Sequence, residues 1–170
     1  YTISFKKAME TFEAIHNRRS IRNFSSVPVE WHKVTHILEA GKYAPTAGNL
    51  QAWRFIVVVD PKTREKIAET CLEQYWIETA PVIIVIAALT YKTNQYYGLR
   101  GERLYSVQEC AAAAENMVLA AEDMGVGSCW VSAFDEQEMK TTLGIPDNAR
   151  PQIVLALGYP NEVTPRPPKE

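Results

Sequence analysis

The sequence predicts an α+β fold in which helices pack over a central sheet. Runs of apolar and β-branched residues at 53–60 and 82–89 have the length of strands, and segments with helical spacing of apolar residues separate them. Strands separated by long helices favour a layered arrangement of this kind. The 170 residues suit one domain over 1–170, with a C-terminal tail from about residue 160.

The first quarter of the chain predicts two helices. Phe12 and Ile15 belong to an apolar pattern at helical spacing, so the first helix is expected over about residues 7–18. The second helix is expected over 30–44, because its apolar residues fall on one helical face before Pro45 ends the pattern.

The polar face of that second helix contains a candidate metal-binding pattern. His32, His36 and Glu39 are spaced so that a helix places all three on one side. An amphipathic helix requires such a polar face opposite apolar residues such as Val34 and Ile37. The favoured interpretation is therefore a solvated face, and no metal site is predicted.

The middle of the chain predicts two strands, a helix and a loop. A strand is expected at 53–60 and an amphipathic helix at 62–76. Residues 82–89 are almost wholly apolar, which favours a strand at the centre of its sheet. Residues 90–102 have no convincing periodicity, so they are expected to form a mobile loop.

The C-terminal half predicts the longest helix and two further strands. The helix is expected over about 103–125, and its run of alanines allows another helix to approach closely. Short strands are expected at 128–134 and 152–159. Cys129 lies in the first of these apolar patterns and is predicted to be a core residue rather than a nucleophile.

Composition and missing motifs exclude several classes of function. A formal net charge of -2 argues against a general nucleic-acid binder. Three cysteines without CxxC spacing indicate neither a disulfide framework nor a zinc knuckle, and a reducing, cytoplasmic setting fits best. No apolar run reaches the ~20 residues that span a bilayer, and residues 1–10 lack the apolar core of a signal peptide. Nucleotide-binding and hydrolase motifs such as GxxxxGK, HExxH and GxSxG are absent.

Residues 18–24, with the sequence RRSIRNF, concentrate positive charge in a chain that has little net charge. The polar members of this segment are Arg18, Arg19, Ser20 and Arg22. Ile21 and Phe24 alternate with them and are expected to anchor the segment against the body of the protein. Guanidinium groups and a hydroxyl suit the oxygens of a phosphate monoester. The alternative is that the arginines follow a helix C-terminus, where cations are favoured by ~0.3–1 kcal/mol each.

Residues 45–51, with the sequence PTAGNLQ, join a predicted helix to a predicted strand. Their small side chains allow the backbone to approach a flat ligand closely. The side-chain amides of Asn49 and Gln51 donate and accept hydrogen bonds at once, which matches the mixed edge of a flavin ring. An ordinary turn rich in Pro, Gly and Asn is the alternative.

The two segments together resemble the nitroreductase family of flavin enzymes, in the patterns RRSIR-x-F and APTAGN-x-Q-x-W. Supporting similarity in GVGSCWVSAF and ALGYPNEVTPRPPK extends the resemblance over nearly the whole chain. The resemblance implies an α+β fold with a central mixed sheet sandwiched by helices. It also implies an intertwined homodimer that binds FMN at its interface.

The same resemblance implies which residues form the site. Those expected to hold the phosphate and ribityl end of FMN are Arg18, Arg19, Ser20 and Arg22, with Arg166 in the tail as a second basic contact. Those expected to meet or lie beside the flavin are Pro45, Thr46, Ala47, Asn49, Gln51, Trp130, Val131 and Ser132. No residue is required as a general acid or base, because hydride chemistry belongs to the cofactor.

The expected function is that of an FMN-dependent oxidoreductase. NAD(P)H would pass a hydride to the flavin and leave, and an electron-poor acceptor such as a nitroaromatic or quinone would then take its place, which gives ping-pong kinetics. A different flavin reaction on the same fold, or flavin binding without turnover, are the alternatives. Larger members carry extra helices where this chain has only 90–106. Tyr96, Tyr97 and Arg100 are candidates to line the substrate pocket, but the favoured interpretation is that they belong to a solvated loop.

Overall fold

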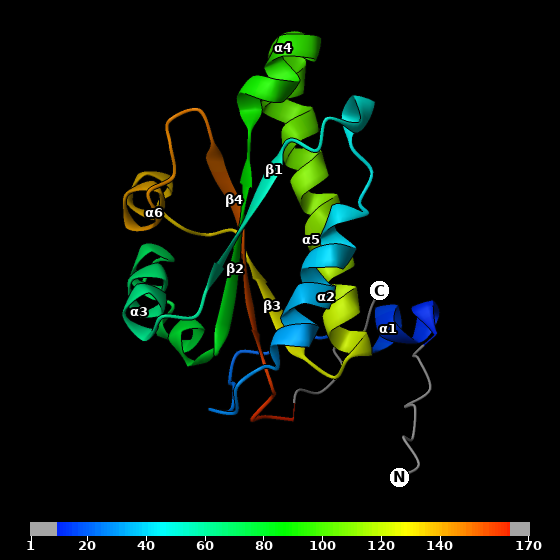
Figure 1. Ribbon diagram of the computed structural model, residues 1–170. Coiled ribbons are helices and arrows are strands. Elements are labelled where there is room, and N and C mark those ends of the chain that lie inside the picture. The colour runs from blue at the N-terminus through cyan, green and yellow to red at the C-terminus, as the bar shows by residue number, and fades with distance from the viewer. Residues whose placement is uncertain (1–9, 164–170) are drawn as a thin grey trace, which may run out of the picture.

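A four-stranded sheet in the order β1-β2-β4-β3 forms the centre of the protein (Figure 1). The computed structural model describes residues 10–163. The strands are β1 (Trp53–Val58), β2 (Val82–Ala88), β3 (Gly127–Val131) and β4 (Arg150–Gly158). The α-helices are α1 (Thr11–Asn17), α2 (Trp31–Lys42), α3 (Pro61–Thr70), α4 (Thr90–Arg100), α5 (Ser106–Asp123) and α6 (Glu136–Leu143). Shorter helical turns are η1 (Ala47–Asn49), η2 (Tyr75–Thr79) and the π-helical η3 (Gly101–Tyr105).

The sheet differs from the mixed sheet that the resemblance implied, because all three strand pairs are antiparallel. After β1 ends at Val58, α3 and η2 return the chain to the same end of the strands, where Ile83, the second residue of β2, pairs with Val58. The chain therefore reverses direction instead of crossing over. One parallel pairing is present in the described part of the chain, an isolated bridge between Ser20 and Ser128.

Helices cover both faces of the sheet, as predicted (Figure 1). On one face α2 and α5 pack against Ile84 and Ile86 of β2, and on the other face α3 and α6 pack against Ile83 and Val85. Because alternate residues of a strand point to opposite faces, a strand that is covered on both sides must be apolar throughout. All residues of β2 are buried, which confirms its central place.

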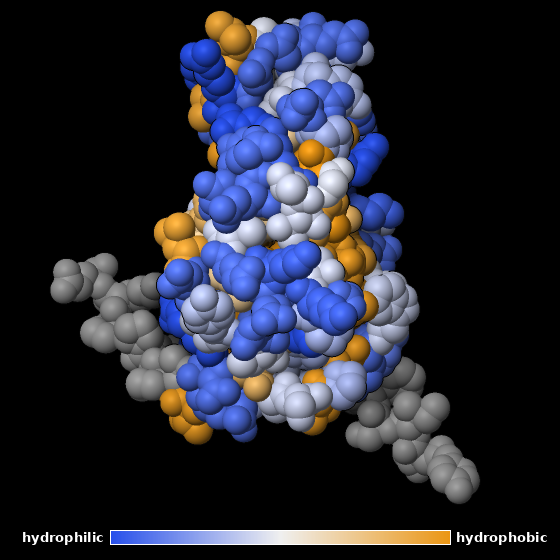
Figure 2. Space-filling model, turned by 90° about the vertical axis from the view of Figure 1, so that its left-hand side faces the viewer, coloured by the Kyte–Doolittle hydropathy of each residue, from blue (hydrophilic) through white to orange (hydrophobic). Residues whose placement is uncertain are grey.

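The two outer surfaces of this sandwich differ in polarity. The surface that α3 and α6 present is mostly hydrophilic (Figure 2). On the side of α1 and α2, by contrast, large apolar side chains are open to solvent. Phe12 is 75% exposed, Trp31 60% and Tyr43 78%. The apolar residues that predicted the first helix do lie in a helix, but in a single chain Phe12 and Ile15 face solvent.

The segment 90–102 was expected to be a loop, and this prediction is wrong. Residues 90–100 form α4, and the chain continues through η3 directly into α5. The amphipathic signal is missing because α4 buries only Thr90 and Thr93 and projects from the sheet (Figure 1). Gly98 interrupts the helical geometry at φ 59° and ψ -150°, a conformation accessible to glycine.

The short helix α6 was not predicted, although the sequence contains its start signal. Asp135 precedes the helix, and its carboxylate accepts a hydrogen bond from the Glu138 amide at 2.8 Å. The helix has one buried residue, Met139, so its apolar periodicity is too weak to recognise. The predicted core role of Cys129 is confirmed, since this residue is 1% exposed. Within residues 10–163, no helix is both long and apolar enough to cross a membrane.

Candidate functional site

The arginine segment runs along the start of β3 and is anchored there by backbone hydrogen bonds. The Ile21 amide donates to the Ser128 carbonyl at 3.0 Å, and the Ser25 amide donates to the Tyr159 carbonyl at 2.8 Å. Ile21 and Phe24 are buried in the core under α3 and α6, which confirms that they anchor the segment. The polar residues between them remain at or near the surface.

The arginines of this segment do not all point the same way. Arg18 and Arg19 lie near Glu122 at the end of α5, where their charges lower the pKa of that carboxyl against the larger, opposite effect of burial. The guanidinium group of Arg22 instead lies 5.9 Å from the ring of Trp76 in η2. Arg18 is also the C-cap of α1, as the helix-end alternative requires. The cluster therefore combines a cation at the end of α1 with an exposed guanidinium group at Arg22.

The loop 45–51 adopts a strained backbone conformation. Gly48, Asn49 and Gln51 have φ angles of 56°, 55° and 49°, in the left-handed region that residues other than glycine rarely occupy. The Gln51 amide donates to Thr46 Oγ1 at 3.2 Å, and Gln51 Nε2 donates to Asn49 Oδ1 at the same distance. Strain of this kind persists only where surrounding structure holds it, and it is concentrated at functional sites.

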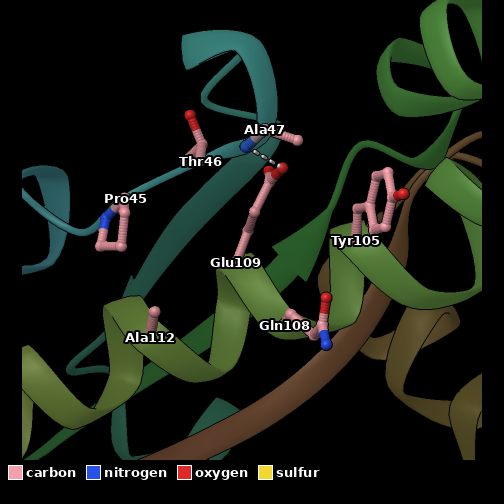
Figure 3. A pocket seen from close by; sticks show the side chains of 7 residues that line it. All are labelled: Pro45, Thr46, Ala47, Tyr105, Gln108, Glu109 and Ala112. Atoms are coloured by element: carbon pink, nitrogen blue, oxygen red, sulfur yellow. Dashed lines mark hydrogen bonds between the residues drawn. The ribbon is translucent and has the colours of Figure 1, made fainter.

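A cavity of about 350 Å³ lies between this loop and the N-terminal end of α5 (Figure 3). Its lining residues are Pro45, Thr46, Ala47, Tyr105, Gln108, Glu109 and Ala112. Pro45, Thr46 and Ala47 were predicted from the sequence, whereas the residues from η3 and α5 were missed. The sequence signal that could have identified Glu109 is a carboxylate next to the alanine run of the predicted helix.

Glu109 connects the wall of the cavity to the loop. Its side chain rises from α5 toward Ala47, and Oε1 accepts a hydrogen bond from the Ala47 amide at 2.9 Å (Figure 3). The residue is 4% exposed, and within residues 10–163 its Oε2 has no hydrogen-bond partner. Burial raises the pKa of Glu109, opposed by the amides of Ala47 and Ala52, which favour the charged form.

Aromatic residues of α4 and η3 flank the same loop. The Tyr97 hydroxyl lies so close to Gly48 that a Cβ atom there would be 2.6 Å from it. The rings of Tyr97 and Tyr105 meet edge to face at 5.4 Å, and Arg100 Nε donates to the Tyr105 hydroxyl at 3.2 Å. Tyr97 and Arg100 therefore contact the wall of the cavity through Tyr105, while Tyr96 remains 65% exposed.

The remaining predicted residues lie at the end of β3 or outside the described part. Trp130 Nε1 donates to Ser132 Oγ at 2.8 Å, which fixes the indole beside the C-terminal end of β3. Val131 is buried in the core under α3 and α6. Arg166 lies outside the described residues.

The two main parts of the predicted site lie at opposite ends of α5. Glu109 marks the end that contacts the loop, and Glu122 marks the end near Arg18 and Arg19. Thirteen residues of α-helix separate these glutamates, which corresponds to about 20 Å along the helix axis. None of the arginines of the segment lines the cavity. Within one chain, the loop and the arginines thus do not form a single pocket.

Comparison with known proteins places this geometry in a family. The model of the nitroreductase family matches residues 15–78 and 70–159. A protein of Archaeoglobus fulgidus that is named as a NADH dehydrogenase/NAD(P)H nitroreductase is 35% identical over 157 residues, which cover 90% of this chain and 87% of the relative. FMN reductase (NADPH) of Bacillus subtilis is 30% identical over 94% of this chain and 71% of its own length.

Solved structures agree with the sequence comparison. The crystal structure of a nitroreductase family protein from Clostridium novyi superposes with a TM-score of 0.83 at 31% identity, over 91% of this chain and 87% of that one. The match to the family model includes the arginine segment, the strained loop and the helix α5 that lies between them. The chain therefore belongs to the nitroreductase family.

Proposed function

We propose that the protein is an FMN-dependent oxidoreductase that uses NAD(P)H to reduce small electron-poor acceptors such as nitroaromatics or quinones. The observation that carries this proposal is the strained loop 45–51, which forms one wall of a cavity and exposes the side-chain amides of Asn49 and Gln51. Family membership supports the proposal, and so do the names of the relatives in Archaeoglobus fulgidus and Bacillus subtilis.

The residues of this chain fit FMN in the chemistry of their donors. Guanidinium groups of Arg18, Arg19 and Arg22, with the hydroxyl of Ser20, match the oxygens of a terminal phosphate. At the strained loop, Asn49 and Gln51 present amides, and the absence of a side chain at Gly48 lets the backbone approach a planar ring. When bound, FMN supplies the hydride and electron transfer, while these residues bind and orient it.

Two chains are proposed to share each FMN site. The supporting observation is the separation of about 20 Å between the arginine end and the loop end of α5. In a two-fold symmetric dimer the same surface of each chain is used twice, so the arginine end of one chain meets the loop end of its partner. The exposed apolar side chains of Phe12, Trp31 and Tyr43 supply a surface that such a partner would bury.

One shared site for donor and acceptor implies ping-pong kinetics. NAD(P)H would bind over the flavin, give up its hydride and leave before the acceptor enters. A non-catalytic flavin-binding module with the same fold would bind FMN equally well but would not pass electrons on. A related fold with a different flavin reaction would accept electrons from NAD(P)H but would not transfer them to nitroaromatics or quinones.

The cofactor and its turnover are tested on the purified protein. Heat releases the cofactor for identification by mass, and FMN is expected, whereas FAD or no flavin would contradict the proposal. Under anaerobic conditions, NAD(P)H should bleach the flavin absorbance and a quinone should restore it. Bleaching without recovery would favour a different flavin reaction, and no bleaching would favour the binding module.

A further inference from the structure

We propose that Glu109 is a positioning residue, which holds the loop 46–51 in the conformation that meets FMN by accepting the hydrogen bond of the Ala47 amide. This inference rests on the proposed function, because it assigns the loop to the cofactor. It adds a residue from α5 that the sequence patterns of the site do not contain.

The loop needs an external support. Three left-handed residues, Gly48, Asn49 and Gln51, give it a backbone conformation that an unsupported chain would leave. The hydrogen bonds from Gln51 to Thr46 and Asn49 are internal to the loop, so they fix its local shape without attaching it to the body of the protein.

Glu109 supplies the attachment at the start of the loop. Ala47 follows Thr46 directly, and its amide donates to Glu109 Oε1 at 2.9 Å, across 62 residues of sequence. The other end is attached through Ala52, whose carbonyl accepts the Leu89 amide at 2.8 Å and whose amide also favours the charged form of Glu109. The Ala47 bond therefore contributes to the distance between the loop and α5.

Packing does not explain why a carboxylate is present at this position. Its neighbours on the buried side of α5 are Cys110 and Ala113, and a small apolar residue would fit that surface. A buried carboxylate costs free energy unless hydrogen bonds or a cation compensate it, and no salt bridge to Glu109 is found among residues 10–163. The amides of Ala47 and Ala52 both favour the charged form of Glu109, and these two residues lie at the start of the loop and directly after it.

A second contact to the loop comes from α4. The Tyr97 hydroxyl lies against Gly48, where a Cβ atom would be 2.6 Å from it, so that the tyrosine would have to move. The loop thus contacts both α4 and α5, and removal of the Glu109 bond leaves the Tyr97 contact, the internal bonds and the attachment of Ala52 to Leu89 to maintain its position.

Two conservative substitutions separate the effect of the side-chain length of Glu109 from the effect of its charge. Glu109→Gln keeps an acceptor oxygen at the same distance from Ala47 but removes the charge. Glu109→Asp keeps the charge but withdraws the carboxylate by one methylene group, so that it no longer reaches the Ala47 amide. The exposed Glu115 on the same helix provides the matched controls, Glu115→Gln and Glu115→Asp.

Titration of FMN into the apoprotein and hydrogen exchange of the Ala47 amide test the assignment. We expect Glu109→Asp to raise the Kd for FMN about 10- to 100-fold and to accelerate exchange at Ala47. Glu109→Gln should restore both to within about threefold of the wild-type values, and the Glu115 controls should change neither.

The proposal is wrong if both Glu109 variants lose FMN affinity to the same extent, or if neither of them loses it. A role in stability alone would also overturn it, and would show as a lower unfolding midpoint in Glu109→Asp with an unchanged Kd and slow Ala47 exchange. A wild-type chain that binds no FMN would refute the proposed function instead, and exchange at Ala47 would still decide whether Glu109 holds the loop.

Discussion

The two faces of the sheet are covered by helical layers of different character. In the layer of α3 and α6, both helices begin with an aspartate cap, at Asp60 and Asp135, and the outer surface is mostly hydrophilic (Figure 2). In the layer of α2 and α5, no side chain caps the N-terminus of either helix, the buried carboxylate of Glu109 has no ion pair within residues 10–163, and the adjoining loop is strained.

This difference separates the part of the molecule that specifies the fold from the part that is proposed to bind the cofactor and the partner chain. Natural sequences follow local rules of capping, patterning and polar satisfaction where structure alone matters, and depart from them at functional sites. Departures here include the strained loop at the cavity and the exposed apolar side chains of α1 and α2, while the end of α3 has two of its own, at Leu72 and Glu73, both with φ angles of 58°. Because the cavity lies beside α5, the layer of α2 and α5 is the one that we expect to meet the flavin ring and the partner, whereas Arg22 reaches toward η2 of the other layer.

The largest effect is expected from Arg22→Ala. Loss of a charge-assisted hydrogen bond worth ~1.5–3 kcal/mol should raise the Kd for FMN by roughly 10- to 150-fold, with the protein still folded. FMN titration into the apoprotein measures this change. If Arg22 served only to stack on Trp76 of η2, affinity would be unchanged and a small loss of stability would remain.

Trp31→Ala sharpens the comparison of the two surfaces. Trp31 is 60% exposed on α2. If burial of each tryptophan contributes ~1 kcal/mol to association, a symmetric dimer loses ~2 kcal/mol in total, and its dissociation constant should rise about 30-fold. The control is Tyr75→Ala in η2, which is 50% exposed on the other side. Sedimentation over a range of concentrations should show weaker association for Trp31→Ala alone, and equal behaviour of the two variants would count against the assignment.

Asp135→Ala tests the other layer. Removal of the cap of α6 should lower the free energy of unfolding by ~1 kcal/mol, because the Glu138 amide loses its acceptor. Since α6 lies away from the cavity, the Kd for FMN should stay at the wild-type value. Urea unfolding and FMN titration measure the two quantities, and a weakened Kd would show that the layers are coupled.

The smallest effects concern the pH dependence of stability, and they have opposite signs in the two layers. Arg150 hydrogen-bonds Glu136 and lowers its pKa below 4.5, so this carboxylate stabilises the fold above pH 4.5 and loses that contribution as pH falls through the folded value. Burial raises the pKa of Glu122 above 4.5, so its ionisation costs stability as pH rises through the folded value.

Glutamine variants make this contrast measurable. At neutral pH Glu136→Gln should melt below the wild type and Glu122→Gln above it. As pH falls, the Glu122 difference should shrink first, between its raised folded pKa and pH 4.5, and the Glu136 difference should shrink below pH 4.5. Melting temperatures across this range decide the point. Shifts of the same sign in both variants would show that burial does not dominate at Glu122.

The sequence was sufficient to predict the parts of the fold that have strong periodicity. The apolar runs of β1 and β2, the long helix α5 and the anchoring of Ile21 and Phe24 were predicted because burial imposes a pattern on the residues. The helix α4 could not be recognised, because it buries almost nothing and its residues follow no face.

Parts of the site were hidden from sequence reasoning for a different reason. Glu109 and Tyr105 line the cavity, yet each is one side chain in a helical segment, and its neighbours across the cavity lie some 60 residues away in sequence. Only the fold brings α5 to the loop. The antiparallel pairing of the strands could not be predicted from the sequence either, because the direction of β2 depends on the end of β1 to which α3 and η2 return the chain.

The central claim, that Arg22 and Asn49 from different chains serve one FMN site, is tested by mixing two inactive variants. Arg22→Ala and Asn49→Ala are co-refolded, and NADH-driven reduction of a quinone is assayed with FMN in excess. In a heterodimer with shared sites, one site carries both lesions and the other carries none. Random mixing gives about half heterodimers, so about a quarter of the wild-type activity should return. If confirmed heterodimers recover no activity, each site is built from a single chain and the claim is wrong.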